Sequence, residues 1–491
     1  MRFDNLVLLA KSCIKISLCI IIVFTVLYSV GYLLLYRTIF KRKKVITVST
    51  FIWITMVCCY LASVLVAVFS GRGSINVRKI RPLFSSYKEA WHTWSFTDWR
   101  NIVLNYCLFV PFGFLLPVRL KPLRNMLRIG LLALLFSFTV ECVQLLLKTG
   151  VFEMDDLLGN TLGALVGYGC YGFVSYIVAL FRKKIGLKVS RIILLQVPLF
   201  AIILGYAGML LIYNTKQFGN NKNSFYYGYD PGEFNVTSDY KLSDTEQLCP
   251  LYKTEVLSLN EALELCEKKM NVLEWTGHEK IKEIFEDHVY VSYSPKGSGE
   301  PAGLRINSCN SQYRGGLYRC NITFGALWNK LKEEMKIENP DDCSIKEALA
   351  GYGEIIPDGY VFKNMGHEKY AYMYDFVQYD NGYLYGSYIC TIVSNTLRSY
   401  DNSVYKCTYV GKYPIISEKE AFMQIVNGRF RLRGENIAKG LSNDERLNIN
   451  ITDCVLEYEP DSKGYLQPQY RFNCIINEQN KDVLIPALID R

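Results

Sequence analysis

Polar side chains interrupt three apolar stretches of this chain, and these are the residues whose types and spacing could do chemistry. The stretches are 101–113 (NIVLNYCLFVPFG), 137–144 (SFTVECVQ) and 155–167 (DDLLGNTLGALVG). In the second stretch Ser137, Glu141 and Gln144 are spaced i, i+4 and i+7, so a helix would present all three on one face. An ionisable group inside an apolar span costs roughly 3 kcal/mol or more and usually faces the interior of a bundle. Glu141 could therefore bind a ligand there, or act as a general acid or base.

The first and third stretches add polar groups that would complete such a site. Asp156 and Asn160 are spaced i, i+4 at the start of an apolar run, with Asp155 beside them. We expect one ligand-binding site built from Asn105, Glu141, Gln144, Asp155, Asp156 and Asn160. Two plainer interpretations remain open. Amides between spans hold helices together at about 0.6–2 kcal/mol each, and aspartates cap helix N-termini, where anions are favoured.

Carboxylate oxygens are ligands for hard cations, so Glu141 and the aspartates are chemically able to hold a divalent cation. The sequence has no metal-ligand spacing signature, however, and we predict neither a metal nor another cofactor. Only four histidines occur in the chain, and no Ser-His-Asp arrangement can be recognised.

Small residues accompany the polar ones. Gly159, Gly163 and Gly167 form a stripe at four-residue spacing, which lets two helices approach closely. Pro111 and Gly113 lie in the first polar stretch. We assign all five a structural role.

Long apolar runs must position these residues. The runs are 16–36, 45–69, 102–116, 129–147, 157–181 and 192–213, and most have the roughly 17–25 residues that a spanning helix needs. They predict an all-α bundle of about six membrane spans over residues 1–215. The third run is short and holds two prolines, so a broken or re-entrant segment is the alternative.

Charge divides the chain into two parts. Residues 1–215 carry 24 Lys and Arg against 7 Asp and Glu, whereas residues 216–491 carry 31 against 39. The basic residues lie mostly in short linkers between apolar runs, where membrane proteins place them. The overall positive charge is therefore no sign of nucleic-acid binding.

Three linkers are basic without an acid, at 37–44, 119–128 and 182–191. We expect them to face the cytoplasm, which puts the acidic turn at 153–156 and the C-terminal part outside the cell. Six crossings also put the N-terminus outside; if the third run does not cross, the N-terminus is inside. The predicted location is a cell membrane, crossed several times.

The composition and repeated motifs of the C-terminal part predict a second domain. Residues 216–224 are polar and are expected to form a linker, and residues 225–491 have the tyrosine-rich, alternating composition of an α+β extracytoplasmic domain. The pattern Ser-x-x-Glu-Ala recurs at Ser258, Ser344 and Ser417 and predicts three capped helix starts, hence repeated helix-plus-sheet units. This part has nine cysteines, and we expect a disulfide between Cys454 and Cys474.

The motifs N-x3-F-x-P-x-G, S-x3-E-x2-Q and D-D-x3-N-x2-G, in this order, resemble the VanZ-like membrane family over about residues 45–182. The resemblance implies a small helical bundle in a bacterial cell membrane, linked to glycopeptide resistance, notably to teicoplanin. One position departs from it. The family commonly has an arginine after the glycine that precedes the acidic stretch, whereas Val151 follows Gly150.

The last repeated unit, about 412–474, resembles the PepSY and YycI-like extracytoplasmic modules, which implies that it regulates a membrane-bound partner. Three hypotheses follow. The outer polar site binds a lipid-linked cell-wall precursor or a lipidated glycopeptide; or an enzyme acts on an envelope lipid with Glu141 as its base; or the outer domain is a sensor for a membrane protein partner.

Overall fold

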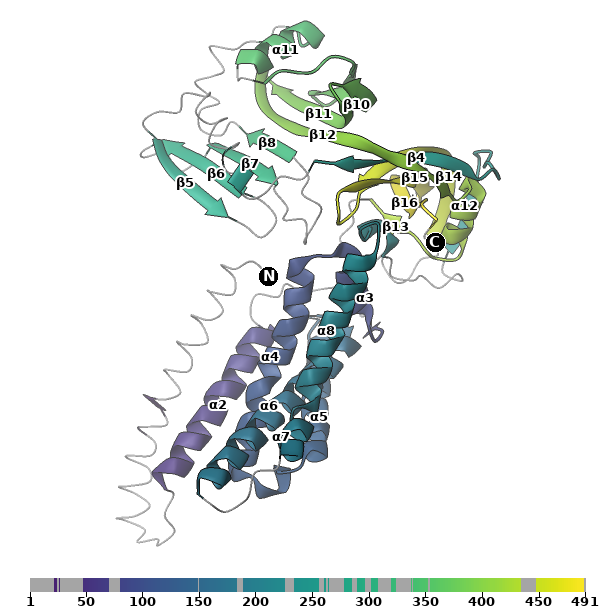
Figure 1. Ribbon diagram of the computed structural model, residues 1–491. Coiled ribbons are helices and arrows are strands. Elements are labelled where there is room, and N and C mark those ends of the chain that lie inside the picture. Colours follow the sequence, from purple (N-terminus) through teal and green to yellow (C-terminus); the bar gives the residue numbers. More distant parts are fainter. Residues whose placement is uncertain are drawn as a thin grey trace. The chain divides into compact units, whose positions relative to one another are not determined.

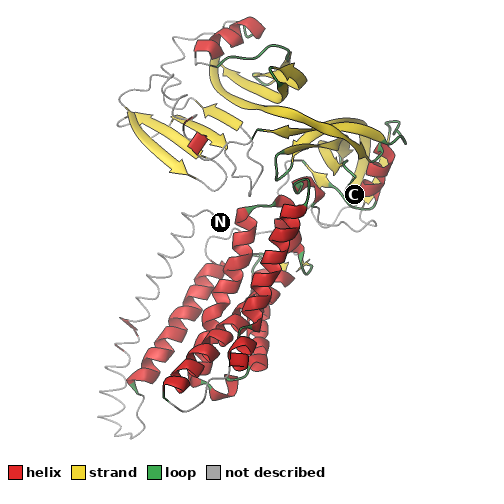
Figure 2. Cartoon of the chain, in the orientation of Figure 1, coloured by secondary structure: helices red, strands yellow, loops and turns green. Residues whose placement is uncertain are grey.

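The computed structural model divides the chain into two compact units, one of residues 1–90 and 97–216, the other of residues 91–96, 217–438 and 444–491. The structure describes residues 47–69, 80–148, 150–182, 189–225, 234–255, 278–284, 289–295, 302–307, 319–323, 339–351, 354–433 and 447–489, with a few isolated positions. The first unit is helical and the second is rich in sheet, as Figure 2 shows.

Helices of the first unit run alongside one another (Figure 1). They are α2 (Val48–Phe69), α3 (Ser85–Thr93), α4 (Phe96–Arg119), α5 (Met126–Leu146), α6 (Met154–Phe181), α7 (Val189–Leu195) and α8 (Val197–Thr215). All except α3 and α7 are long and apolar enough to cross a membrane, which makes five candidate spans among the described residues. The predicted span at 16–36 lies outside the described residues apart from three positions.

The run at 102–116 is part of one continuous helix, α4, although Pro111 and Pro117 lie inside it. Prolines are tolerated in such helices where neighbours bond the backbone. Helix α2 bonds other carbonyls of α4 near these prolines: Tyr60 donates its hydroxyl to the Leu108 carbonyl at 3.0 Å, and Trp53 donates its indole N–H to the Leu115 carbonyl at 2.8 Å. This helix is therefore continuous and not broken.

The run at 192–213 is instead divided. It forms α7 and α8, which are separated at Gln196, and Pro198 lies in the first turn of α8. The Gln196 amide donates to the Gly169 carbonyl of α6 at 3.0 Å, which fixes the break against the bundle.

Backbone contact between α4 and α6 explains the glycine stripe. A Cβ atom at Gly163 would lie 2.1 Å from the Tyr106 carbonyl oxygen, and one at Gly167 would lie 2.0 Å from that of Val110. At Gly113 a Cβ atom would lie 1.8 Å from the Ala164 carbonyl oxygen, so the close approach requires glycine on both helices. Gly159 is less crowded, since its Cβ would lie 3.6 Å from the nearest atom.

A single sheet of 14 strands organises the second unit. Its strands are β3 (Phe234–Ser238), β4 (Gln247–Thr254), β5 (His278–Ile284), β6 (Val289–Pro295), β7 (Ala302–Asn307), β8 (Arg319–Thr323), β9 (Val361–Gly366), β10 (Lys369–Tyr379), β11 (Gly382–Val393), β12 (Thr396–Ile415), β13 (Arg431–Leu432), β14 (Leu447–Pro460), β15 (Tyr465–Ile476) and β16 (Gln479–Pro486). The long strand β12 pairs with β11 and β8 in its first half and with β4 in its second (Figure 1).

Two helix-plus-meander units occur in this sheet. Helix α11 (Asp342–Gly351) precedes the antiparallel strands β9 to β12, and α12 (Glu418–Val426) precedes the antiparallel strands β14 to β16. Ser417 caps α12 as expected, because its hydroxyl accepts the Glu420 N–H. The expectation for Ser344 was wrong: α11 starts earlier, and Asp341 accepts the Ser344 N–H at 2.8 Å. Ser258 lies outside the described residues.

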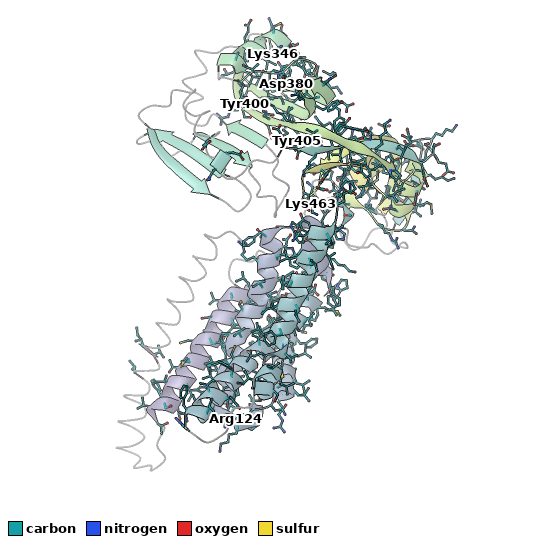
Figure 3. The ribbon with its side chains drawn as sticks, viewed as in Figure 1. Arg124, Lys346, Asp380, Tyr400, Tyr405 and Lys463 are labelled. Atoms are coloured by element: carbon teal, nitrogen blue, oxygen red, sulfur yellow. The ribbon has the colours of Figure 1, made fainter. Side chains whose placement is uncertain are left out.

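Buried tyrosines fill part of this unit. The hydroxyls of Tyr388 and Tyr400 both donate to the carboxylate of Glu354, and all three side chains are buried. Figure 3 labels Tyr400 on β12. The tyrosine-rich composition therefore builds a hydrogen-bonded core.

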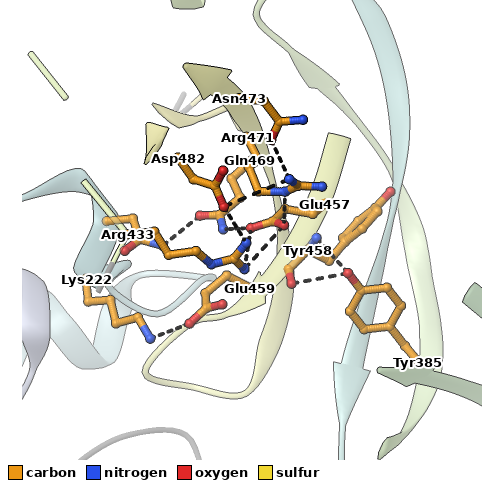
Figure 4. A network of polar contacts seen from close by, with 11 residues as sticks. Lys222, Tyr385, Arg433, Glu457, Tyr458, Glu459, Gln469, Arg471, Asn473 and Asp482 are labelled. Carbon is orange, nitrogen blue, oxygen red and sulfur yellow. Dashed lines mark hydrogen bonds and ion pairs between the residues drawn. The ribbon is translucent and has the colours of Figure 1, made fainter. Parts of the chain in front are cut away.

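The segment expected as a linker, 216–224, is packed into the second unit from residue 217 onward. Asp461 accepts the Gly219 N–H at 2.6 Å, and the Asn223 amide donates to Gln469 at 2.7 Å. Figure 4 shows the polar network that continues from Gln469, in which Glu457 accepts from Arg433, Gln469 and Arg471. The composition of this segment did not predict these hydrogen bonds.

Cys454 and Cys474 are free thiols, so the expected disulfide is not formed. They lie on paired strands, but Cys454 is opposite Phe472 and Cys474 is opposite Ile451. This offset register separates the two residues along the ladder.

Candidate functional site

A polar cavity of about 250 Å³ lies in the first unit, where the N-termini of α4 and α6 meet α3. Its lining residues come from α3, α4, α6 and the two strands β1 (Ile80–Arg81) and β2 (Phe152–Glu153). They are Arg81, Ser86, Tyr87, Glu89, Asp98, Asn101, Ile102, Asn105, Glu153, Asp155, Asp156 and Gly159.

A short parallel ladder forms one side of this cavity. Ile80 pairs with Phe152 and Arg81 with Glu153. The Arg81 guanidinium forms ion pairs with Glu153 at 2.9 Å and with Glu89 at 2.6 Å. Because the Arg81 side chain is 16% exposed, solvent screens these pairs less than pairs on an open surface.

Asp155 holds the turn before α3. Its carboxylate, on a residue that is 5% exposed, accepts the backbone N–H of Phe84 and, at 2.7 Å, that of Ser86. Phe84 has a φ of 67°, a backbone conformation that residues other than glycine rarely adopt. The two hydrogen bonds from this turn stabilise that conformation and so place α3 over the start of α6.

Asp156 begins a chain of polar contacts that runs into the bundle. Its carboxylate accepts the Asn105 side-chain N–H at 2.6 Å, and its carbonyl accepts the Ser137 hydroxyl at 3.4 Å. Asn160, one turn further on, donates to Ser137 at 2.8 Å. Among the described residues the Asn160 Oδ1 atom is buried without a hydrogen-bond partner.

Glu141 and Gln144 are buried, each 2% exposed, but they do not line the cavity. Glu141 accepts the backbone N–H of Glu153 at 2.9 Å, and Gln144 donates to the Val68 carbonyl at 3.3 Å. These two side chains of α5 therefore hold β2 and the C-terminal end of α2 by hydrogen bonds. Of the six predicted ligand-binding residues, Asn105, Asp155 and Asp156 line the cavity, whereas Glu141, Gln144 and Asn160 do not.

Seven further polar residues line the cavity and were not predicted: Arg81, Ser86, Tyr87, Glu89, Asp98, Asn101 and Glu153. All except Glu153 lie in or next to the stretch 71–100, which has no apolar run. One signal would have found two of them. Asp98, Asn101 and the predicted Asn105 are spaced i, i+3 and i+7, which is one face of α4.

Tyr87 connects the cavity to the core beneath it. Its hydroxyl lies 2.6 Å from that of Tyr106 on α4. Burial raises the pKa of Tyr87 well above its usual value, so its hydroxyl keeps its proton at any physiological pH. Tyr87 therefore offers hydrogen bonds and no negative charge.

Among the residues that the structure describes, no group of three or more His, Cys, Asp or Glu side chains could hold a metal ion. The aspartates and Glu153 instead bond backbone N–H groups, an amide and a guanidinium.

The fold and cavity define a class of protein: a bundle of apolar helices with a polar site at one end. Residues 46–175 match the model of the VanZ/LLP1 family. Protein VanZ of Enterococcus faecium is 26% identical over 139 residues, which is 28% of this chain and 78% of VanZ. The match ends at residue 175 and does not extend into the second unit, so the resemblance to PepSY and YycI-like modules gains no support from it.

A solved structure also resembles part of the chain. It is an uncharacterized protein from Eubacterium rectale ATCC 33656, 10% identical, which covers 52% of this chain and 87% of its own, with a TM-score of 0.24.

The cavity contains a guanidinium near Val151, the position at which the sequence departs from the VanZ-like pattern. The expected arginine after Gly150 is absent, but Arg81 brings a guanidinium to Glu153 from the neighbouring strand. The acidic stretch therefore has a cationic partner, supplied by a distant part of the chain.

Proposed function

We propose that this protein is a multi-pass membrane protein of bacteria that lowers susceptibility to teicoplanin-type glycopeptides. It does so by binding a lipid-linked envelope molecule, or the lipidated drug, in the polar cavity. One observation carries the proposal: every residue that lines the cavity falls between 81 and 159, inside the segment that matches the VanZ/LLP1 family.

The distribution of charge supports an outward-facing cavity. The linker between α4 and α5 carries Arg119, Lys121, Arg124 and Arg128, and it lies at the end of α4 opposite to the cavity; Figure 3 labels Arg124 there. The positive-inside rule assigns this end to the cytoplasm. The cavity then faces the outer leaflet. Helix α8 ends at the cavity end, since Tyr206 packs against Trp99 near the start of α4, so the chain continues into its C-terminal part outside the cell.

Binding is favoured over catalysis by the position of Glu141. The enzyme hypothesis assigned it the role of base, but its carboxylate accepts a backbone hydrogen bond and does not line the cavity. A general base must come within hydrogen-bond reach of the group that it deprotonates.

Teicoplanin susceptibility of a sensitive bacterial host tests this function. The host would carry the intact protein, the Asp98→Asn/Asp156→Asn variant, or the Asp380→Asn control, with membrane levels matched by immunoblot. Asp380 lies exposed in the second unit, on the turn between β10 and β11 (Figure 3), and its φ of 49° suits asparagine.

We expect the intact protein and the Asp380→Asn control to protect the host, and the cavity variant to protect it much less. Equal protection by all three would remove the cavity from the mechanism, and no protection by the intact protein would remove the proposed function. A truncated variant that lacks residues 225–491 tests the hypothesis of a membrane protein partner for the second unit: loss of protection with a folded bundle would favour it.

A further inference from the structure

The cavity carries an excess of negative charge. Five carboxylates line it: Glu89, Asp98, Glu153, Asp155 and Asp156. Arg81 is the one cationic residue among the lining side chains that the structure describes. Lys88 and Arg100 adjoin lining residues in the sequence but do not themselves line the cavity.

Positive charge on Arg81 and at two helix N-termini lies beside these carboxylates. Asp98 lies in the first turn of α4, and Asp155 and Asp156 lie in that of α6. Each helix N-terminus contributes about half an elementary positive charge. With the Arg81 guanidinium, the two helix ends therefore balance about two of the five negative charges.

Hydrogen-bond acceptors also dominate the cavity. Several hydrogen-bond donors of the lining already donate to these carboxylates. Asn105 donates to Asp156, Arg81 donates to Glu89 and Glu153, and the Ser86 backbone N–H donates to Asp155. A ligand that brings positive charge and N–H groups would therefore complement the cavity best.

We propose that the ligand of this cavity enters it with a primary ammonium group and not with a phosphate. The inference takes from the proposed function that a ligand is bound and adds its chemical class. An ammonium group brings one positive charge and three donors, whereas a phosphate would add charge to a negative cavity. A volume of about 250 Å³ has room for about eight water molecules, which suits a head group.

Two amphiphiles with the same chain distinguish these classes: dodecylammonium and dodecyl phosphate. Their affinity for the purified full-length protein would be measured by calorimetry in a neutral detergent. The variants are Asp98→Asn/Asp156→Asn, Arg81→Gln and the Asp380→Asn control, each checked for folding by circular dichroism and thermal melting. Asparagine keeps the size of aspartate and its ability to accept from Asn105.

We expect the intact protein to bind dodecylammonium at least tenfold more tightly than dodecyl phosphate. The double variant should lose at least tenfold in ammonium affinity, and the control should lose none. Arg81→Gln should keep or increase the ammonium affinity, because it releases Glu89 and Glu153 from their ion pairs. This opposite response of the acidic and basic variants separates charge recognition from a general loss of structure.

A preference for dodecyl phosphate that Arg81→Gln weakens would overturn the inference. So would equal ammonium affinity for the intact protein and the double variant, which indicates binding to the detergent micelle alone, and so would the binding of neither probe. A different outcome would contradict the proposed function. Ammonium binding without protection from teicoplanin would keep this inference and remove that function.

Discussion

Arg81 and Glu153 lie opposite each other in a two-residue parallel ladder and form an ion pair of 2.9 Å, although 72 positions separate them in the chain. The pair joins the segment before α3 to the segment before α6, so it closes one side of the cavity with two stretches that share no local sequence pattern.

The ion pair should therefore contribute to stability. The two side chains are 16% and 29% exposed, so we expect Arg81→Gln and Glu153→Gln to show a coupling energy on the order of 1 kcal/mol in a double-mutant cycle. Thermal unfolding of the four proteins in detergent measures it. Strictly additive single effects would show that the pair adds nothing beyond its separate residues.

Glu141 should act through the Glu153 N–H rather than as a base. Glu141→Gln keeps an oxygen that can accept this hydrogen bond, so protection from teicoplanin should persist. Glu141→Ala leaves a buried N–H unsatisfied and should destabilise the protein by about 1–3 kcal/mol. Loss of protection in a fully folded Glu141→Gln variant is the result that would return Glu141 to a chemical role.

Alanine at Gly163 or Gly167 should force α4 and α6 apart, since the added Cβ would meet a carbonyl oxygen at 2.1 or 2.0 Å. We expect each change to cost about 1–3 kcal/mol and to lower the melting temperature. Gly208→Ala is the matched control, because nothing lies within 4 Å of its added Cβ. If the control destabilised the protein as much, the α4–α6 contact would not be the cause.

Burial raises the pKa of the Cys454 and Cys474 thiols to about 12, which leaves on the order of one thiol in ten thousand ionised at pH 8. Since the thiolate is the reactive form, both should resist iodoacetamide in the folded protein, whereas the exposed Cys343 should react. Peptide mass spectrometry measures each site. A disulfide-linked peptide that contains Cys454 and Cys474 would contradict the structure.

The proposed orientation can be measured with a reporter phosphatase that is active only outside the cell. Fused after residue 491 it should be active, and inserted at Arg124 it should be inactive. The reverse pattern would place the cavity in the cytoplasmic leaflet.

Sequence patterns predicted the helical half well because its signals are local. Apolar runs indicated the helices, and four-residue spacing indicated that Gly163 and Gly167 lie in a helix contact. The positions of Asp155 and Asp156 were also informative, since a helix start orients its first-turn side chains together.

The rest depends on pairing between distant segments. Nothing near Arg81 in the sequence indicates that it will meet Glu153, because a two-residue parallel ladder has too few residues for a recognisable strand pattern. Similarly, the strand register that separates Cys454 from Cys474 includes a shift between Ile451 and Asp453, which alternation of apolar residues cannot predict.

The same long separations govern how the cavity can arise during synthesis. Its defining contacts join residues 51, 71 and 72 positions apart, namely Asn105 with Asp156, Phe84 with Asp155, and Arg81 with Glu153. A nascent chain that has completed α4 and α5 already holds Arg81, Tyr87 and Asn105 but lacks the acidic residues at the start of α6. The cavity therefore forms late, when α6 joins the bundle, and a nascent chain stalled before residue 152 would contain helices without this cavity.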